Sequence, residues 1–257
     1  MITPSFGLTA TERVLPKLAL DFTTASLDSR VAFTRSGNTA TVVNSSGYVA
    51  GINADLPRFD YDPITLLCKG LLIEETRENR FIYSGDFSQA TWSKTQSAVT
   101  VDAVNAPTGT LVADKLTTNT TSAEHSVLSP NNTIVSGTTY TVSLFAKAGE
   151  ESFAFMGWNS AGFGSAAPSF FNLSTGVATA GTGQTVSMVD FGDGWWRCTT
   201  TRTATATTST NTGIRIGLTK SNTSSTSTGA NTTDGIYIWG AQLEAGAFAT
   251  SYIPTTS

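Results

Sequence analysis

Tryptophans beside small polar residues give the clearest chemical signal in this sequence. Trp158 is followed directly by Asn159, and Trp195 and Trp196 are adjacent to each other. An aromatic ring can stack on the apolar C–H face of a sugar, while an amide or hydroxyl group binds the sugar hydroxyls. The sequence therefore predicts that a carbohydrate site would use Trp158 and Asn159 at the rim of a domain, with one of Trp195 and Trp196. The alternative is that these rings belong to a core, as most aromatic side chains of β-sandwiches do.

Catalytic chemistry has weaker support. His125 is the only histidine, and the sequence has no Cys-x-x-Cys or His-Glu-x-x-His metal motif. We expect His125 at the surface, in a polar segment. A glycosidase needs two carboxylates about 5–10 Å apart. Three acidic pairs are close in sequence: Asp60 with Asp62, Glu74 with Glu75, and Asp190 with Asp193. Adjacent strand residues face opposite sides and turn aspartates usually cap their own backbone, so we expect no enzymatic activity and no metal site.

The elements that must carry these residues are predicted to be β-strands. The chain has 257 residues, and its polar part is dominated by Thr, Ser, Asn and Gly, which favour strands, turns and loops. From residue 80 onward, strand patterns recur roughly every 8 to 12 residues, as in sandwiches and barrels. In one of them, Tyr140, Val142, Leu144 and Ala146 alternate with Thr141, Ser143, Phe145 and Lys147. We therefore expect an all-β fold with two antiparallel sheets packed face to face.

The first part of the chain has a different pattern. Short apolar pieces are separated by turn residues and by prolines at positions 4, 16, 57 and 63. No run of alternating strands there is long enough to close a core. We expect residues 1–75 to form an extended arm with a few short strands that docks on other chains, and residues 76–257 to form the β-sandwich.

The charge balance argues against two classes of partner. Only 13% of the residues are charged, the net charge is −4 and the pI is near 5.0. Without a basic cluster, the chain lacks the electrostatic signature of a protein that binds nucleic acid or an anionic membrane. We expect no signal peptide and no membrane insertion, because no apolar run approaches about 18 residues. Cys68 and Cys198 lie in apolar, strand-like segments and are predicted to be free thiols.

Several segments of the sequence resemble segments of one protein family. They are, in chain order, GLTATERVLPKLALDFTTASLDSRVAFTR, PRFDYDPITLLCKGLLIEE, RENRFIYSGDFSQATWSK, NAPTGTLVADKL, DGWWRC and IYIWGAQLEAGAFATSYIPT. Through them, nearly the whole chain is similar to phage and prophage virion proteins of the tail-fibre, receptor-binding or head-spike type. Glu78 and Arg80 differ from the Arg-Thr-Asn-Leu motif that is commonest in the family near residue 77. The later module also resembles jelly-roll carbohydrate-binding modules, through Asn79, the segment 85–87, Trp92 and the closing strand at 237–244.

This resemblance implies both a fold and a function. The fold would be a jelly-roll sandwich, and the protein would be a homotrimer that contacts other virion proteins in a particle assembled in the bacterial cytoplasm. Its function would be adhesion to bacterial surface polysaccharide without a cofactor, although a structural calcium ion is sometimes held in such modules. The chief alternative is a purely structural head or tail protein without sugar binding. A glycan depolymerase is the second alternative.

The charged cluster at 74–80 is then the joint where the arm enters the module. The resemblance implies that Glu74, Glu75, Arg77 and Arg80 form ion pairs within the joint or between subunits. The expected pairs are Glu74 with Arg77 and Glu75 with Arg80. Such pairs would fix the angle at which the arm leaves the sandwich.

Overall fold

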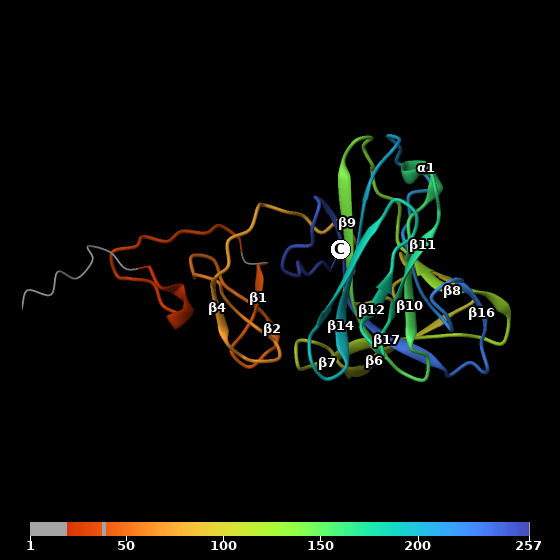
Figure 1. Ribbon diagram of the computed structural model, residues 1–257, viewed down its shortest axis with the longest axis horizontal. Helices are drawn as coiled ribbons and strands as arrows, with labels where there is room; N and C mark the ends of the chain where they lie inside the picture. The colour runs from red at the N-terminus through yellow and green to blue at the C-terminus, as the bar shows by residue number, and fades with distance from the viewer. Residues whose placement is uncertain (1–19, 38–39, 257) are drawn as a thin grey trace, which may run out of the picture.

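The computed structural model describes residues 20–37 and 40–256 and shows an almost entirely β architecture (Figure 1). Two large sheets form a jelly-roll-like sandwich, and their strand pairs are antiparallel. The expected all-β fold with two antiparallel sheets is therefore confirmed. The described part of the arm, within residues 20–75, lies to one side of the sandwich, at the left of Figure 1.

The two sheets differ in their strands. The six-stranded sheet has the order β13-β14-β9-β17-β7-β6. Its strands are Thr185–Asp190, Trp195–Thr203, Thr139–Ala148, Gly235–Ala245, Leu111–Thr117 and Ala98–Asn105. The seven-stranded sheet has the order β12-β11-β10-β15-β8-β16, and β5 also pairs with β8. Its strands are Val177–Thr179, Pro168–Asn172, Phe153–Gly157, Arg215–Thr219, Ser122–Leu128, Thr226–Thr228 and, for β5, Ser93–Thr95. A one-turn helix, α1 (Ser160–Phe163), follows β10.

The core between the sheets is built from alternate strand residues. On β9, the inward residues are those that the alternation predicts: Tyr140, Val142, Leu144 and Ala146. Full burial of a Leu or Val side chain contributes about 1.5–3 kcal/mol. The large rings of this core, all 0% exposed, are Phe81, Phe87, Trp92, Trp158, Phe163 and Phe171. The sandwich therefore holds most of the buried apolar side chains in the described part of the chain.

A β-bulge in β17 changes which residues face this core. Ile238 points inward on the first half of the strand, and Leu243 does so on the second half. Even-numbered residues face the core before the bulge and odd-numbered residues face it afterwards. This happens because the register shifts between Trp239 and Gln242, and one extra residue reverses the alternation of side chains. Gly240 lies in the bulge with a φ of 62°, a left-handed conformation that glycine adopts without a steric clash. The bulge thereby turns Gln242 to the outer face of the sheet.

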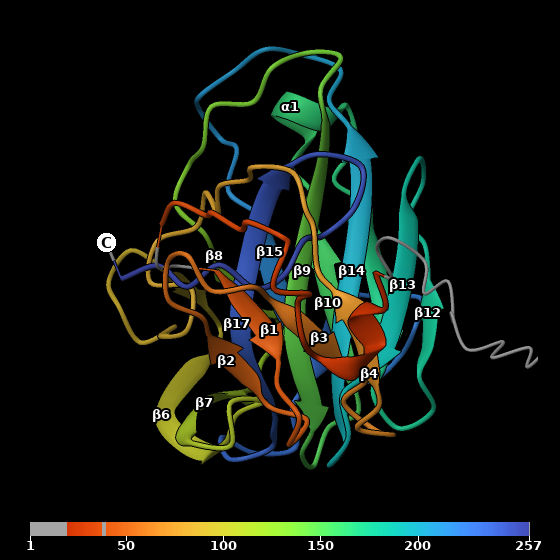
Figure 2. The same ribbon diagram turned by 90° about the vertical axis from the view of Figure 1, so that its left-hand side faces the viewer.

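Part of the outer face of the six-stranded sheet is also buried, because the arm lies across it (Figure 2), whereas the outward residues of the edge strand β13 are exposed. A second apolar group, which we call the outer-face cluster, consists of Val49, Ala106, Ala113, Phe145, Trp195, Trp239 and Tyr252. Val49 belongs to the arm, and Tyr252 belongs to the C-terminal segment that follows β17. The arm thus contributes to an apolar cluster that is centred on the sandwich.

The described arm consists of two hairpins and a short 3-10 helix. The hairpins pair β1 with β2 and β3 with β4, and these strands are Thr41–Val43, Val49–Gly51, Phe59–Tyr61 and Cys68–Leu71. The 3-10 helix η1 (Phe22–Thr24) begins after Asp21, whose carboxylate accepts a hydrogen bond from the Thr23 N–H at 3.0 Å. Residues 72–80 then run to the sandwich without regular structure. The few short strands expected of the arm are present.

Expectations about three single residues have different outcomes. Cys68 and Cys198 are free thiols, as predicted, and burial raises the pKa of Cys198 above its usual range. The expected surface position of His125 is wrong. Its side chain is fully buried, and its ring nitrogens lie 2.5 Å and 3.1 Å from the carbonyl oxygens of Gln96 and Ser227. The ring therefore has a structural role between the β5–β6 turn and β16.

No helix within residues 20–37 and 40–256 combines the length and the apolar character needed to cross a membrane.

Candidate functional site

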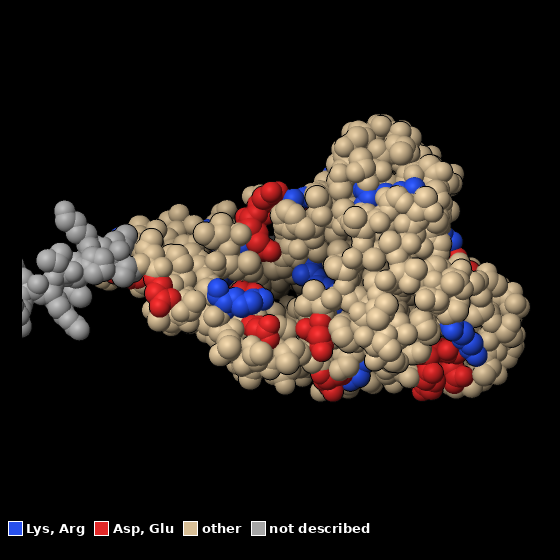
Figure 3. All heavy atoms as spheres, in the orientation of Figure 1, with Lys and Arg blue, Asp and Glu red and all other residues tan. Residues whose placement is uncertain are grey.

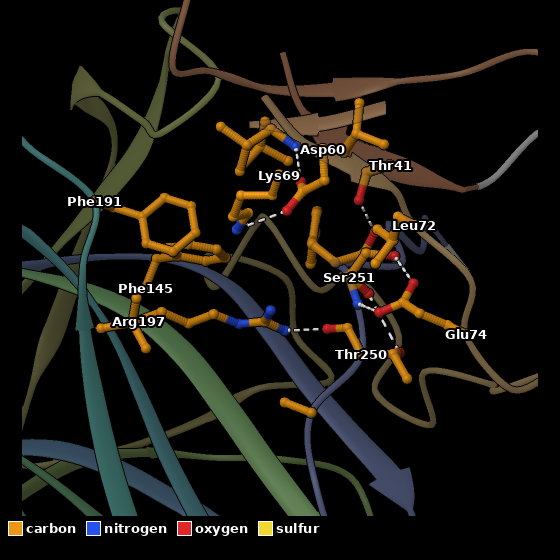
Figure 4. Close-up of a pocket in the computed structure, with 16 residues that line it drawn as sticks. Thr41, Asp60, Lys69, Leu72, Glu74, Phe145, Phe191, Arg197, Thr250 and Ser251 are labelled. Carbon is orange, nitrogen blue, oxygen red and sulfur yellow. Dashed lines mark hydrogen bonds and ion pairs between the residues drawn. The ribbon is translucent and has the colours of Figure 1, made fainter. Parts of the chain in front are cut away.

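A cavity of about 210 Å³ lies between the arm and the outer face of the six-stranded sheet. We call it the junction cavity (Figure 4). The arm lines it with Asp60 and Lys69, the sheet with Arg197, the β13–β14 turn with Phe191, and the C-terminal segment with Thr250. Figure 3 shows that most of this face of the molecule is uncharged and that several charged side chains gather over the arm and its junction with the sandwich. Three separate parts of the chain therefore meet at one polar site.

Glu74 ties the end of the arm to the C-terminal segment. Its Oε2 accepts hydrogen bonds from the Arg58 guanidinium and from the Ser251 hydroxyl, each at 2.7 Å. Its Oε1 accepts a third from the Ser251 N–H, also at 2.7 Å. The Arg58 and Glu74 side chains are only 10% and 15% exposed. Because water screens them little, these charge-assisted bonds are stronger than those of a surface pair.

Asp60 forms a second charged pair within the arm and also joins its two hairpins. Lys69 Nζ lies 2.7 Å from Asp60 Oδ2 across the β3–β4 hairpin. The other oxygen of Asp60 accepts a hydrogen bond from the Val43 N–H of β1 at 2.9 Å. The Thr41 hydroxyl at the start of β1 donates to the carbonyl oxygen of Tyr252 at 2.5 Å. Polar bonds thus connect both hairpins to each other and to the C-terminal segment.

Arg197 of β14 forms the sheet side of the cavity. Its Nη2 donates to the Thr250 carbonyl oxygen at 2.6 Å and to the Ser143 hydroxyl oxygen at 3.1 Å. Its guanidinium carbon lies 5.4 Å from the centre of the Phe145 ring, within cation–π range. The Nε atom is buried and has no hydrogen-bond partner among the described residues. The guanidinium is therefore held in place but incompletely hydrogen-bonded.

Glu244 of β17 is a buried acid beneath the same junction. It is 0% exposed, and its two oxygens accept hydrogen bonds from the Thr250 N–H, at 3.1 Å, and from the Thr250 hydroxyl. Burial lowers the pKa of Arg197, whereas the negative charges of Glu244 and Glu74 raise it. Glu244 therefore compensates part of the Arg197 charge across a distance while its own oxygens bind Thr250.

The expected ion pairs of the joint are wrong in their partners. Glu74 pairs with Arg58 of the arm and not with Arg77. Glu75 pairs with Arg77, at 2.7 Å, and not with Arg80. Along an extended backbone, residues two apart face the same side and residues three or five apart face opposite sides, so Glu75 meets Arg77 and not Arg80. Glu74 and Arg77 point away from each other, and folding of the arm hairpins brings Arg58 to Glu74 instead.

Arg80 is directed toward the sandwich. Its Nη1 donates to the Thr133 carbonyl oxygen at 2.9 Å, and its guanidinium carbon lies 5.4 Å from the centre of the Tyr140 ring. In the described part of the chain it forms no ion pair. Arg80 therefore contributes to the base of the joint through a carbonyl and an aromatic ring.

Trp158 and Asn159 do not form an exposed sugar site. Trp158 is 0% exposed, with its ring centre 4.4 Å from that of Phe163, and its Nε1 donates to Thr200 Oγ1 at 3.2 Å. Asn159 caps α1, because its side-chain oxygen accepts a hydrogen bond from the Gly162 N–H at 2.9 Å. Helix α1 places Phe163 against the tryptophan ring. The expectation of an exposed Trp158 is wrong for this reason.

Trp195 and Trp196 face opposite sides of β14, as strand geometry predicts. Trp195 lies in the outer-face cluster, is 2% exposed, and donates from Nε1 to the Asn105 carbonyl oxygen at 3.1 Å. Trp196 packs against the inner core, is half-buried, and donates to the Leu173 carbonyl oxygen at 2.9 Å. Of the three candidate tryptophans, Trp196 alone is not fully buried.

The start of the module holds a buried acid with a shifted pKa. Burial raises the pKa of Asp114 to about 6, hydrogen bonds from the N–H groups of Phe87 and Asp102 oppose the shift, and the charges of Asp86 and Asp102 add to it. Within residues 20–37 and 40–256, no three or more His, Cys, Asp or Glu side chains are grouped to hold a metal ion. We therefore assign no residue to the structural calcium ion that the resemblance allows.

Two arginines of the junction could not be recognised equally well from the sequence. Arg197 alternates with Trp196 and Cys198, so a strand at this point places it on the outer face with Trp195. This alternation is the signal by which Arg197 can be found from the sequence. For Arg58 there was no local signal, because its partner Glu74 lies 16 residues later and reaches it through the fold of the arm.

No protein-family model matches this chain, and the comparison with curated proteins gives no match. The features that bear on function are therefore the junction cavity, the exposed side chains and the sequence segments that resemble virion proteins.

Proposed function

We propose that the chain is a structural appendage subunit of a phage particle, in which the arm makes the contacts of assembly and the sandwich projects from them. One observation carries this proposal, namely the concentration of exposed apolar side chains on the arm. Large apolar residues exposed on the described arm are Leu20, Tyr48, Leu56, Ile64, Leu66, Leu67 and Ile73. They are seven of the thirteen such residues in the described chain, although the arm is its smaller part.

The arrangement of the arm supports this role. Its polar contacts with the C-terminal segment run through Glu74 and Thr41, and its Val49 joins the outer-face cluster. The apolar side chains that it leaves exposed include Leu67 at 69% and Ile73 at 80%. Exposed apolar patches of this kind are typical of surfaces that other protein chains cover. A second copy of the chain or a neighbouring virion protein would bury them.

The test is the oligomeric state of a surface variant. Leu67→Glu places a charge on the exposed apolar surface of the arm and should dissociate the oligomer, a trimer by resemblance, into smaller species in light scattering. Val177→Glu is the matched control, because Val177 is 59% exposed but lies on β12 of the sandwich. It should leave the oligomer intact. A wild-type chain that is monomeric at micromolar concentration would contradict the proposal.

Adhesion to bacterial surface polysaccharide is the second candidate function, and the partial exposure of Trp196 favours it. Base stacking on aromatic side chains, a comparable contact, contributes about 1–3 kcal/mol per base. If Trp196 stacks on a sugar, Trp196→Ala should weaken binding of the purified protein to a glycan array or to host cells by about this amount. Unchanged binding would exclude Trp196 as the stacking ring, and absence of binding by the wild-type protein would leave assembly as the one proposed role.

A further inference from the structure

The junction cavity is lined by a cation that the protein itself does not fully satisfy. A guanidinium has five N–H donors, and Arg197 uses only Nη2 for its bonds to Thr250 and Ser143. In the described part of the chain, no group accepts a hydrogen bond from Nε or Nη1 of Arg197. Burying a charge is unfavourable unless it has partners. If the residue at position 197 only supported the arm, an uncharged side chain there would cost less free energy to bury.

The carboxylates that line the cavity have other partners. Asp60 lies 2.7 Å from Lys69, and Glu74 lies 2.7 Å from Arg58. Each pair is internally neutral and lies on the arm side of the cavity. Neither carboxylate therefore serves as a direct hydrogen-bond acceptor for the guanidinium of Arg197.

Glu244 faces Arg197 from β17 and is the remaining acid of the junction. Thr250 occupies both of its carboxylate oxygens, one through its N–H and the other through its hydroxyl. Glu244 compensates the Arg197 charge from a distance, which makes a buried guanidinium tolerable at this position. It does not accept a hydrogen bond from Nε or Nη1. Because Nε is itself buried, Nη1 is the donor that a molecule entering the cavity would meet.

We propose that the junction cavity binds a small organic carboxylate, whose oxygens accept hydrogen bonds from the Arg197 guanidinium. A planar guanidinium matches the geometry of a carboxylate, which makes arginine the usual partner for such groups. Phe145 and Phe191 give the cavity apolar walls, which suit the carbon part of an organic acid better than a fully hydrated inorganic anion. Figure 4 shows Arg197 extending toward Thr250 below these rings, with Lys69 on the opposite side.

The size and access of the cavity limit the ligand. Its volume of about 210 Å³ is below the roughly 300–1,000 Å³ of pockets for drug-sized molecules, so the ligand is a short-chain acid or a single sugar-acid ring. A hollow of about 310 Å³ along β13 and β14 shares Val189, Arg197 and Ala249 with the cavity. This hollow supplies the route of entry from solvent.

Binding at this position would stabilise the docked arm. The ligand would contact β14, the arm and the C-terminal segment together, and a ligand that binds only the docked state shifts the equilibrium toward it. The site is independent of the apolar surface that we propose for assembly, because Leu67 and Ile73 do not line the cavity. Failure of one proposal therefore leaves the other intact.

The experiment is a melting-temperature titration of the full chain with sodium acetate, sodium glucuronate and glucose, at constant ionic strength adjusted with sodium chloride. A carboxylate present at about five times its Kd should raise Tm by about 2–4 °C. Glucose should have no effect. A shift with acetate alone identifies a short acid as the ligand class, and a shift with both salts extends it to sugar acids.

Arg197→Gln should abolish the carboxylate-dependent shift, and Arg197→Lys, which keeps the charge but loses the planar fork, should weaken binding by about tenfold. The control is Arg215→Gln, on β15 of the other sheet, where Arg215 pairs with Glu124 at 2.6 Å. It should retain the full shift. If Arg197→Gln does not fold, Arg197→Lys carries the test. Equal shifts in wild type and Arg197→Lys, a shift with glucose, or none with either salt up to about 50 mM would overturn the proposal.

Discussion

The two faces of the six-stranded sheet are buried in different ways. The inner face meets the seven-stranded sheet through alternating apolar residues such as Val142 and Leu144. The outer face carries a smaller apolar cluster and, around the junction cavity, the charged residues Glu74, Asp60 and Arg197. Apolar burial gives most of the stability of a fold, whereas polar contacts exchange bonds with water and contribute less net free energy. We therefore expect the arm to open far more readily than the sandwich.

Trp158 gives the largest expected effect and tests the inner face. Its ring is fully buried against Phe163, so Trp158→Ala leaves a cavity and removes the hydrogen bond from the ring nitrogen to the Thr200 hydroxyl. The free energy of unfolding should fall by about 3–5 kcal/mol in denaturant titration. A loss below about 1 kcal/mol would place the ring at the surface, where the sequence analysis expected it.

Asp114 contrasts with Glu74, because it is a buried acid without the direct cation partner that Glu74 has in Arg58. The pKa of Asp114 is raised to about 6, above the ordinary value of about 3.9. Between pH 4 and 6 the folded state therefore binds more protons than the unfolded state, and the free energy of unfolding should fall by about 2–3 kcal/mol as pH rises through this range. Asp114→Asn should remove this component from the pH profile. An identical profile in wild type and variant would contradict the assignment.

Arg58 tests the outer face. Arg58→Ala leaves Glu74 with Ser251 alone and should destabilise the docked arm by about 2 kcal/mol. Limited proteolysis should then cut within residues 1–75 faster than in wild type and leave a fragment from about residue 76 onward, because the sandwich core is untouched. Arg215→Ala is the control, because it breaks a comparable pair, with Glu124 on the seven-stranded sheet, and should leave cleavage of the arm unchanged. Unchanged cleavage in Arg58→Ala would mean that the pair does not hold the arm.

Glu75 gives the smallest expected effect. Its side chain is 65% exposed in the pair with Arg77, so water and salt screen the interaction. Glu75→Ala should change the free energy of unfolding by less than about 1 kcal/mol and leave the proteolysis pattern unchanged. A larger effect, measured beside Arg58→Ala, would move the main contact of the joint from Glu74 to Glu75.

The difference between the two faces also explains what the sequence could predict. The alternation from Tyr140 to Lys147 shows which residues of β9 face the core, since a strand has a period of two. The burial of Trp158 depends on Phe163 of α1, which a strand pattern does not reveal. The pair of Arg58 and Glu74 depends on how the arm hairpins fold. Polar junctions between distant segments have no local periodicity, so a sequence pattern does not reveal the partner of Glu74.

Hydrogen–deuterium exchange on wild type and Leu67→Glu tests whether the arm carries the contacts of assembly. In the wild-type oligomer, amides of the β3–β4 hairpin, Phe59–Leu71, should be protected. In Leu67→Glu they should exchange at least about tenfold faster, because separation of the subunits exposes them. Amides of β9 and β17 should exchange equally slowly in both proteins. Equal arm protection in an intact oligomer and in a dissociated variant would contradict the claim.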